Sequence, residues 1–366
     1  MASLGPPPAD LDLTATRAPE MIGVLSTTWS LAIIAIGLRL WSRRLMRSRL
    51  WLDDWLILVS VLWSGSFMFM ITCWMVRHGF GRHVWAAPPE ATKVWAIGLF
   101  IAEITYTLSL VFVKYSILAF YWRVFGAQRS IRIPIWVLAG MVLAWGASVI
   151  LVSIFQCLPV QAFWQRFDFV APLPAEAYHC GVDDNDFFNG NAIPNIITDV
   201  MIMALPVPYI WKLYMPRAQK VAITSVFVVG IFVTIISIVR FTFVLRVDLT
   251  SPDITWNFVD TQMWTSLEGN VATVCACLPS LKPILNLLVY GSVESKPEPS
   301  NRAARGTLVT IGGSGESRKN RSRTAQGMRG STSKHATETY SDEHPFAQLA
   351  DDDSMTRGRA TELQTL

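Results

Sequence analysis

The chain has 366 residues, of which 52% are hydrophobic and only 16% are charged, and its formal net charge at pH 7 is +4. Its mean hydropathy is +0.36. These values are typical of membrane proteins and argue against an ordinary soluble globular domain. The small positive charge accompanies no basic stripe on a soluble domain, so no nucleic acid partner is indicated.

Seven long apolar segments, separated by short polar loops, fill the first 290 residues. Each has at least the ~20 residues that an α-helix needs to cross about 30 Å of hydrocarbon. The segments are Met21–Leu40, Asp54–Met75, Trp95–Trp122, Pro134–Phe155, Gly190–Trp211, Val221–Leu245 and Met263–Tyr290. The sequence therefore predicts an all-α, polytopic membrane protein whose seven transmembrane helices occupy residues 21–290.

Basic residues in the loops predict how this bundle is oriented. With the N-terminus outside, the inner loops hold ten of them and the outer stretches hold six. The ten are Arg43, Arg44, Arg47, Arg49, Arg123, Arg129, Arg132, Lys212, Arg217 and Lys220. The six are Arg17, Arg77, Arg82, Lys93, Arg166 and Arg246. We therefore predict an extracellular N-terminus over residues 1–20 and a cytoplasmic C-terminus.

The composition changes at Gly291, after which Ser, Thr, Gly, Arg, Asp and Glu predominate. Too few apolar residues remain there to build a core. Residues 291–366 are expected to form a disordered cytoplasmic tail.

Two of the five cysteines, Cys157 and Cys180, fall in the long loop after the fourth segment, which this orientation places outside. An oxidising exterior permits a disulfide there, and closing such a loop stabilises a protein by about 3 kcal/mol in the chain-entropy model. We expect the two cysteines to pair.

No pattern typical of a phosphate-binding loop, a nucleophile elbow or a metal site occurs in the chain. We therefore expect no metal and no cofactor. The absence of these motifs also argues against most enzyme classes. A retinal Schiff base needs a lysine in the last helix. The lysine there, Lys282, lies nearer the cytoplasmic end than the centre, so photochemistry is not expected.

Charged residues inside the segments are costly and usually mark a functional site. Those at membrane depth, away from the segment ends, are Glu103, Lys114, Asp199, Arg240 and Glu268. At 1.5 Å per residue, Arg240 and Glu268 lie roughly 9 Å from the outer boundary, and Glu103 and Asp199 lie roughly 14 Å from it. The equal depths predict an Arg240–Glu268 ion pair. Glu103 and Asp199 either share a proton, or one of them is neutral.

Further polar side chains lie close to these charges along the helices. Tyr106 shares a face with Glu103, and Asn195 lies one turn before Asp199. The predicted ligand-binding residues of a pocket open to the outside are Glu103, Tyr106, Asn195, Asp199, Arg240, Trp264 and Glu268. The alternative is that these groups only join the helices through hydrogen bonds. Lys114 is expected to be structural, as the partner of a carboxylate or a carbonyl group.

Asp53 and Asp54 open the second segment, directly after a basic loop. Acidic side chains at a helix N-terminus are favoured by the helix dipole and by free N–H groups. We expect both to cap this helix, with Arg47 or Arg49 as a further partner. After the same segment, residues 79–83 (GFGRH) predict a tight turn that depends on glycine.

An ordered set of motifs resembles the fungal rhodopsin-like family of seven-helix integral membrane proteins. The motifs are LDDW (52–55), GFGRH (79–83), KYSILAFYWRVF (114–125), QCLPVQAFW (156–164), NIITDVMIMALPVPYIWKL (195–213), IVRF (238–241) and CACLPSLKP (275–283). The resemblance makes Asp53, Asp54, Lys114, Asp199, Pro206, Arg240, Glu268 and the two loop cysteines the pattern positions. That family includes surface-sensing, receptor-like proteins and members encoded in the satratoxin gene cluster.

The resemblance does not fix the mechanism. Our first hypothesis is a non-enzymatic, receptor-like protein that senses a small or lipidic ligand from the outer side. The alternative is a membrane component of a secondary-metabolite (mycotoxin) pathway, acting as a transporter or as a cyclase that uses Glu103 and Asp199 as acids. The expected partners are the lipid bilayer, the ligand and a cytoplasmic signalling protein. The third helix ends in YWRVF (121–125) without an Asp/Glu-Arg-Tyr motif, so coupling to a G protein is an analogy only. The membrane is expected to be the plasma membrane or an endomembrane.

Overall fold

A computed structural model of the chain describes residues 6–126, 129–168, 171, 173–182, 184–208, 217–247, 251–281 and 284. Within these residues, seven helices contain 18 residues or more. They are α1 (Ala18–Leu45), α2 (Leu52–Phe69), α3 (Ala91–Phe125), α4 (Arg129–Phe155), α6 (Asp184–Ala204), α8 (Arg217–Arg246) and α10 (Val259–Cys277). Lys282, the ends of the fifth and seventh predicted segments and the predicted tail lie outside the described residues.

Short elements connect the long helices. They are the π-helix η1 (Met70–Met75), the 3-10 helices η2 (Val76–His78), η3 (Val84–Ala86), η4 (Ala175–Ala177) and η5 (Leu278–Leu281), the helices α5 (Ala162–Gln165) and α9 (Ile254–Asn257), and the strands β1 (Cys157–Leu158) and β2 (His179–Cys180). The two strands pair antiparallel with Cys157 opposite Cys180, and these cysteines form the predicted disulfide.

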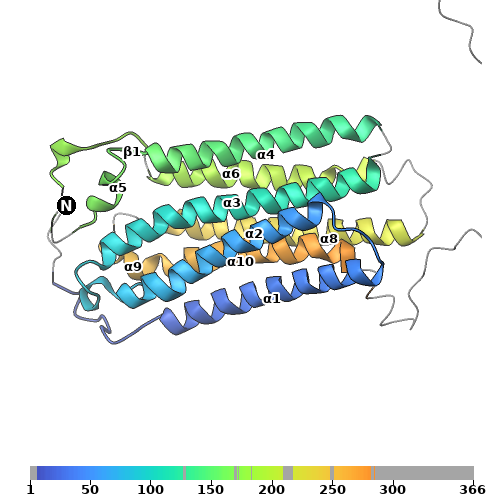
Figure 1. Ribbon diagram of the computed structural model, residues 1–366. Helices are drawn as coiled ribbons and strands as arrows, with labels where there is room; N and C mark the ends of the chain where they lie inside the picture. The colour runs from blue at the N-terminus through green and yellow to red at the C-terminus, as the bar shows by residue number, and fades with distance from the viewer. Residues whose placement is uncertain are drawn as a thin grey trace, which may run out of the picture. The chain divides into compact units, whose positions relative to one another are not determined.

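The long helices pack side by side (Figure 1). Helix α3 contacts α2, α4 and α10, and α10 also contacts α1 and α8. We call the end of the bundle that carries the disulfide the disulfide end. The opposite end, where α2 begins with Asp53 and Asp54, is called the aspartate end.

The helix termini follow local chemistry. Pro19 lies in the first turn of α1, and Arg43 and Arg44 lie in its last turn, where the helix dipole favours cations. At the far end of α2, η2 stops at Gly79, whose φ of +98° is left-handed. A Cβ on Gly79 would lie 2.8 Å from Pro88 Cδ, so this turn requires glycine. The glycine-dependent turn expected at residues 79–83 is confirmed.

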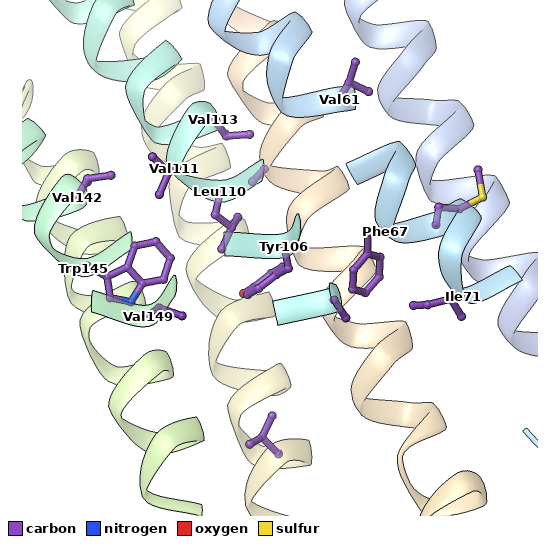
Figure 2. Packing of buried hydrophobic residues seen from close by; sticks show 14 of the residues in the cluster. Val61, Phe67, Ile71, Tyr106, Leu110, Val111, Val113, Val142, Trp145 and Val149 are labelled. Carbon is purple, nitrogen blue, oxygen red and sulfur yellow. The ribbon is translucent and has the colours of Figure 1, made fainter. Parts of the chain in front are cut away.

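Large apolar side chains occupy both the interior and the outer surface of the bundle. Figure 2 shows Phe67, Tyr106 and Trp145 on adjoining helices in the buried cluster. On the outside, Leu31 of α1, Ile133 of α4 and Phe232 of α8 are more than half exposed. Buried polar groups with apolar groups outside suit a lipid environment and not water.

Four helices in the described part of the chain are long and apolar enough to cross a membrane. These are α1, α2 with its continuation to His78, α3 and α4. In α10, Asp260, Gln262, Glu268 and Asn270 interrupt the apolar run. Three of these four, all but Asp260, are buried, so the polar side chains of α10 mostly face protein. The chain is therefore a membrane protein with several apolar helices.

Candidate ligand site in the bundle interior

The carboxylate of Glu268 lies at the centre of a buried polar cluster, and its side chain is 1% exposed. Tyr106 Oη donates to Oε2 at 2.5 Å, and Asn195 Nδ2 donates to Oε1 at 2.9 Å. Ser237 Oγ donates to Oε1 at 2.5 Å, and Arg240 Nε lies 2.5 Å from Oε2. Glu268 of α10 thereby connects side chains from α3, α6 and α8. The hydroxyl and amide partners all donate hydrogen bonds and Arg240 adds a positive charge, so the carboxylate acts as an acceptor only.

The Arg240–Glu268 ion pair expected from equal depth is confirmed. Both side chains are at least 95% buried. The Arg240 guanidinium also lies 5.2 Å from the centre of the Tyr106 ring, where a cation is attracted to the ring face. Arg240 Nη2 has no hydrogen-bond partner among the described residues.

Lys114 is the second centre of the cluster. Its Nζ lies 3.0 Å from Asp199 Oδ1. It donates to the backbone oxygen of Asn195 at 3.0 Å, to Asn195 Oδ1 at 2.7 Å and to Thr198 Oγ1 at 2.7 Å. It also lies 4.9 Å from the centre of the Trp145 ring. The expectation that Lys114 pairs with a carboxylate and a carbonyl group is confirmed.

Glu103 and Asp199, for which we expected either a shared proton or one neutral carboxyl group, have separate partners. Glu103 Oε2 accepts from Asn191 Nδ2 at 3.2 Å, whereas Asp199 pairs with Lys114. We expected Lys114 to partner a carboxylate or a carbonyl group but did not identify Asp199 as that carboxylate, because the lysine lies deeper along α3 than Glu103. Trp264 also differs from the expectation: its ring stacks on Phe243, with centroids 5.4 Å apart, and it makes no hydrogen bond to the cluster in the described residues.

A cavity of about 70 Å³ adjoins the charged cluster. A water molecule needs only about 10–15 Å³ by the same measure, so this space could hold several waters or a small ligand. Lys114, Asp199 and Glu268 line one part of it. The other lining residues described are Leu110, Val113, Ile117, Phe120, Tyr121, Ile202, Met203, Gly230, Val233, Ala272, Cys275, Ala276 and Pro279. The walls are therefore mainly apolar, with charged groups on one side.

Two of the seven predicted ligand-binding residues, Asp199 and Glu268, line this cavity, and the other five are not among its described lining residues. We expected a pocket open to the outside, yet the lining residues extend from Lys114 and Glu268 toward the aspartate end. At the disulfide end there is a second opening, of about 370 Å³, lined by Arg17, Phe243, Arg246, Val247, Trp256, Asn257, Asp260 and Thr261. None of the predicted ligand-binding residues is among these. Charge positions give depth along each helix, while the space between helices depends on side-chain packing.

A second buried charge network lies at the aspartate end. Arg39 donates to Asp53 Oδ2 at 2.5 Å, to Asp54 Oδ1 at 2.8 Å and to the backbone oxygen of Ala276 at 2.7 Å. Arg43 also contacts both aspartates, at 2.7 and 3.3 Å. Arg123 of α3 lies 3.5 Å from Asp53 Oδ1. The network joins α1, α2, α3 and α10.

This network corrects one expectation and confirms another. The capping role is confirmed for Asp54, whose Oδ2 accepts from the backbone N–H of Trp51 at 3.2 Å, whereas the described contacts of the Asp53 side chain are with arginines. The arginine partners are Arg39 and Arg43, in place of the expected Arg47 or Arg49. Sequence reasoning missed Arg39, although it is the one charged residue in the segment Met21–Leu40, which was the signal that could have identified it.

Comparisons with known proteins support the resemblance to the fungal rhodopsin-like family. The family model of the fungal rhodopsin domain matches residues 38–287. The polyenoic acids biosynthesis gene cluster protein Ba17b of Metarhizium anisopliae is 27% identical over 79% of this chain and 79% of its own length. Satratoxin biosynthesis SC1 cluster protein 4 of Stachybotrys chartarum is 25% identical over 52% of this chain and 65% of its own length.

A third relative, the receptor GIN3 of Arthrobotrys oligospora, is 22% identical over 78% of this chain and 67% of its own length. No solved structure matches the chain significantly. The match to the family model covers well over half of the 366 residues. The chain therefore belongs to the fungal rhodopsin domain family.

Proposed function

We propose that this protein is a receptor-like, seven-helix membrane protein that binds a small, largely apolar ligand between α3, α6, α8 and α10. The observation that carries the proposal is the cavity beside Lys114, Asp199 and Glu268. Pockets for small molecules combine apolar walls with a few converging polar groups. This cavity has both.

The arrangement of contacts supports signalling across the bundle. Ala276 lines the cavity, and its backbone oxygen accepts from Arg39. Arg39 in turn holds Asp53 and Asp54 at the aspartate end. A ligand that moves this part of α10 would therefore change a buried charge network on α1 and α2. Two sites that share one packed element can be coupled in this way. The inner loops and the tail would then meet a cytoplasmic partner.

The orientation in the proposal is N-terminus outside and C-terminus inside. The excess of basic residues in the inner loops supports it, as does the disulfide at the end proposed to face the oxidising exterior. A protease-protection assay with tags at both termini tests it. Cleavage of a C-terminal tag from intact cells or sealed vesicles would contradict the orientation.

The charge partners argue against acid catalysis in the cavity. A cyclase needs a carboxylic acid that can give up a proton to an apolar substrate. Glu268 accepts from donors on three helices, and Asp199 is paired with Lys114. Glu103, the other expected acid, is not among the described residues that line the cavity. These contacts support binding in preference to chemistry.

A role in a secondary-metabolite pathway is the second candidate. It is favoured by the names of two relatives, a polyenoic acids biosynthesis gene cluster protein and a satratoxin biosynthesis cluster protein. The name of the receptor GIN3 favours the first candidate. Both roles use the same cavity, whose ligand would be a signal in one case and a pathway compound in the other.

Gene deletion followed by metabolite profiling separates the two roles. A receptor-like role predicts a changed response without the accumulation of one intermediate. A pathway role predicts that one intermediate accumulates because its conversion or export is lost. The deletion strain is then complemented with Ala272→Leu, which fills the cavity, or with Ala147→Leu, the same change on an exposed position of α4.

At equal protein levels, checked by fluorescence size-exclusion chromatography, Ala147→Leu should restore the wild-type phenotype and Ala272→Leu should not. Full restoration by Ala272→Leu would contradict the cavity as a ligand site. The two variants can be compared directly because both add the same three carbon atoms to an α-helix.

A further inference from the structure

One hydroxyl group in the cavity wall has no hydrogen-bond partner among the described residues. Tyr121 of α3 is 1% exposed and lines the cavity. Its Oη is buried and has no hydrogen-bond partner among the described residues. Buried hydroxyl groups in native proteins nearly always have a partner, because leaving one unpaired costs free energy. The described residues therefore provide no acceptor for this hydroxyl group.

The position of Tyr121 relative to the charged groups defines the shape of the site. It follows Lys114 by seven residues on α3. Seven residues are almost two helical turns, so the two side chains share a face and are separated by roughly 10 Å along the axis. The cavity therefore has a charged side near Lys114 and a phenol group nearer the aspartate end. Between them the wall of α3 is apolar, with Ile117 and Phe120.

On the charged side of the cavity, Lys114, Asp199 and Glu268 are all already paired with an oppositely charged group. Lys114 Nζ already contacts three oxygen acceptors and the carboxylate of Asp199. Glu268 is paired with Arg240 and accepts from three hydroxyl or amide groups. An ionised ligand would be left without a counter-charge in a low-dielectric cavity, which is strongly unfavourable. A neutral ligand meets no such penalty.

We infer that the cavity selects a neutral, mostly apolar molecule that carries a hydrogen-bond acceptor, such as a ketone, ester or ether oxygen, and that Tyr121 donates to this acceptor. The inference rests on the proposed ligand-binding function and specifies the chemistry of the ligand. Tyr121 is thus a residue that determines specificity. Without a ligand that supplies an acceptor, the Tyr121 hydroxyl group makes no hydrogen bond to the described residues.

The test uses two probes of nearly the same shape, 4-fluoroacetophenone and 1-ethyl-4-fluorobenzene, which differ in one carbonyl oxygen. Binding to the full-length protein in lipid nanodiscs is followed by fluorine NMR, and partitioning into empty nanodiscs is subtracted. A single neutral hydrogen bond makes a difference of about fivefold in affinity. The wild type should therefore prefer the ketone by about that factor.

Two tyrosine variants complete the experiment. Tyr121→Phe should abolish the preference for the ketone while leaving the hydrocarbon affinity unchanged, and it should not lower the melting temperature, because the lost hydroxyl group has no partner among the described residues. Tyr115→Phe is the matched control on the same helix. Tyr115 Oη donates to the backbone oxygen of Ala139 at 2.9 Å and Tyr115 does not appear in the cavity wall, so its removal should leave the preference intact.

The outcomes separate this inference from the proposed function. If both probes bind the wild type equally, or if Tyr121→Phe keeps the preference, the assignment of Tyr121 is wrong while the cavity remains a ligand site. If neither probe binds above the empty nanodiscs, the cavity itself is contradicted, and both proposals fail together.

Discussion

Arg39 of α1 and Asp53 of α2 form an ion pair with both side chains fully buried, in which Nη2 and Oδ2 lie 2.5 Å apart. The same guanidinium contacts Asp54 and the backbone of Ala276. One side chain therefore joins three helices at the end of the bundle where the loops are basic. An arginine suits this role because its planar group presents several donors in a fixed geometry.

Replacing this arginine should strongly destabilise the fold. In Arg39→Met, Asp53 and Asp54 keep only Arg43 and the more distant Arg123 as cationic partners. Removing one member of a buried pair typically costs about 3–5 kcal/mol. We expect a large fall in melting temperature in nanodiscs. Arg44→Met, an exposed position on the same helix, is the control and should melt like the wild type. Equal stability of Arg39→Met would show that the network contributes little.

The Arg240–Glu268 pair allows a double-mutant cycle. Arg240→Met and Glu268→Leu should each cost about 3–5 kcal/mol, because each leaves a buried charge alone. The double variant should recover only part of this loss, since Tyr106, Asn195 and Ser237 also donate to Glu268.

A second double variant tests that explanation. Arg240→Met combined with Glu268→Gln removes both charges but keeps an acceptor oxygen for the neighbouring donors. It should be more stable than Arg240→Met combined with Glu268→Leu in thermal unfolding. The reverse order would mean that the hydrogen bonds to Glu268 contribute little beside its charge.

The disulfide should make stability sensitive to reduction. Cys157 and Cys180 close a loop with a sequence separation of 23, and the chain-entropy model assigns about 3 kcal/mol to such a bond. Adding a reductant should lower the melting temperature of the wild type and have no effect on Cys157→Ser combined with Cys180→Ser. Cys73→Ser, which removes an exposed free cysteine, should respond to the reductant like the wild type. A wild type that does not respond would contradict the prediction.

The turn after η2 should tolerate no side chain at Gly79. Its φ of +98° is unfavourable for alanine, and the added Cβ would lie 2.8 Å from Pro88 Cδ and 2.9 Å from Ala87 Cβ. We expect Gly79→Ala to cost more than about 1 kcal/mol. Gly140→Ala on α4, where nothing lies within 4 Å of the added atom, should have little effect in the same thermal assay. Similar melting temperatures for both variants would contradict this.

Several features of this protein could be predicted from its sequence because they depend on local or nearly local physics. A long apolar run forms a helix wherever backbone groups cannot bond to water, so each predicted segment corresponds to a helix in the described residues. The Arg240–Glu268 pair followed from depth alone, because a charge in a low-dielectric interior requires a partner at the same level. The pairing of Cys157 with Cys180 followed from two cysteines in one loop.

The tertiary structure decided which side chains face one another around the bundle. Arg39 and not Arg47 reaches Asp53, Lys114 and not Glu103 reaches Asp199, and the cavity lies on the aspartate side of the charges. The ion pairs depend on how far each helix is rotated about its own axis and on where it ends, since Arg47 lies beyond the end of α1, and the cavity depends on how side chains pack between the helices. In a soluble helix a polar stripe reveals that rotation. In this protein lipid and interior are both apolar, so the sequence carries depth along each helix far more clearly than direction around it.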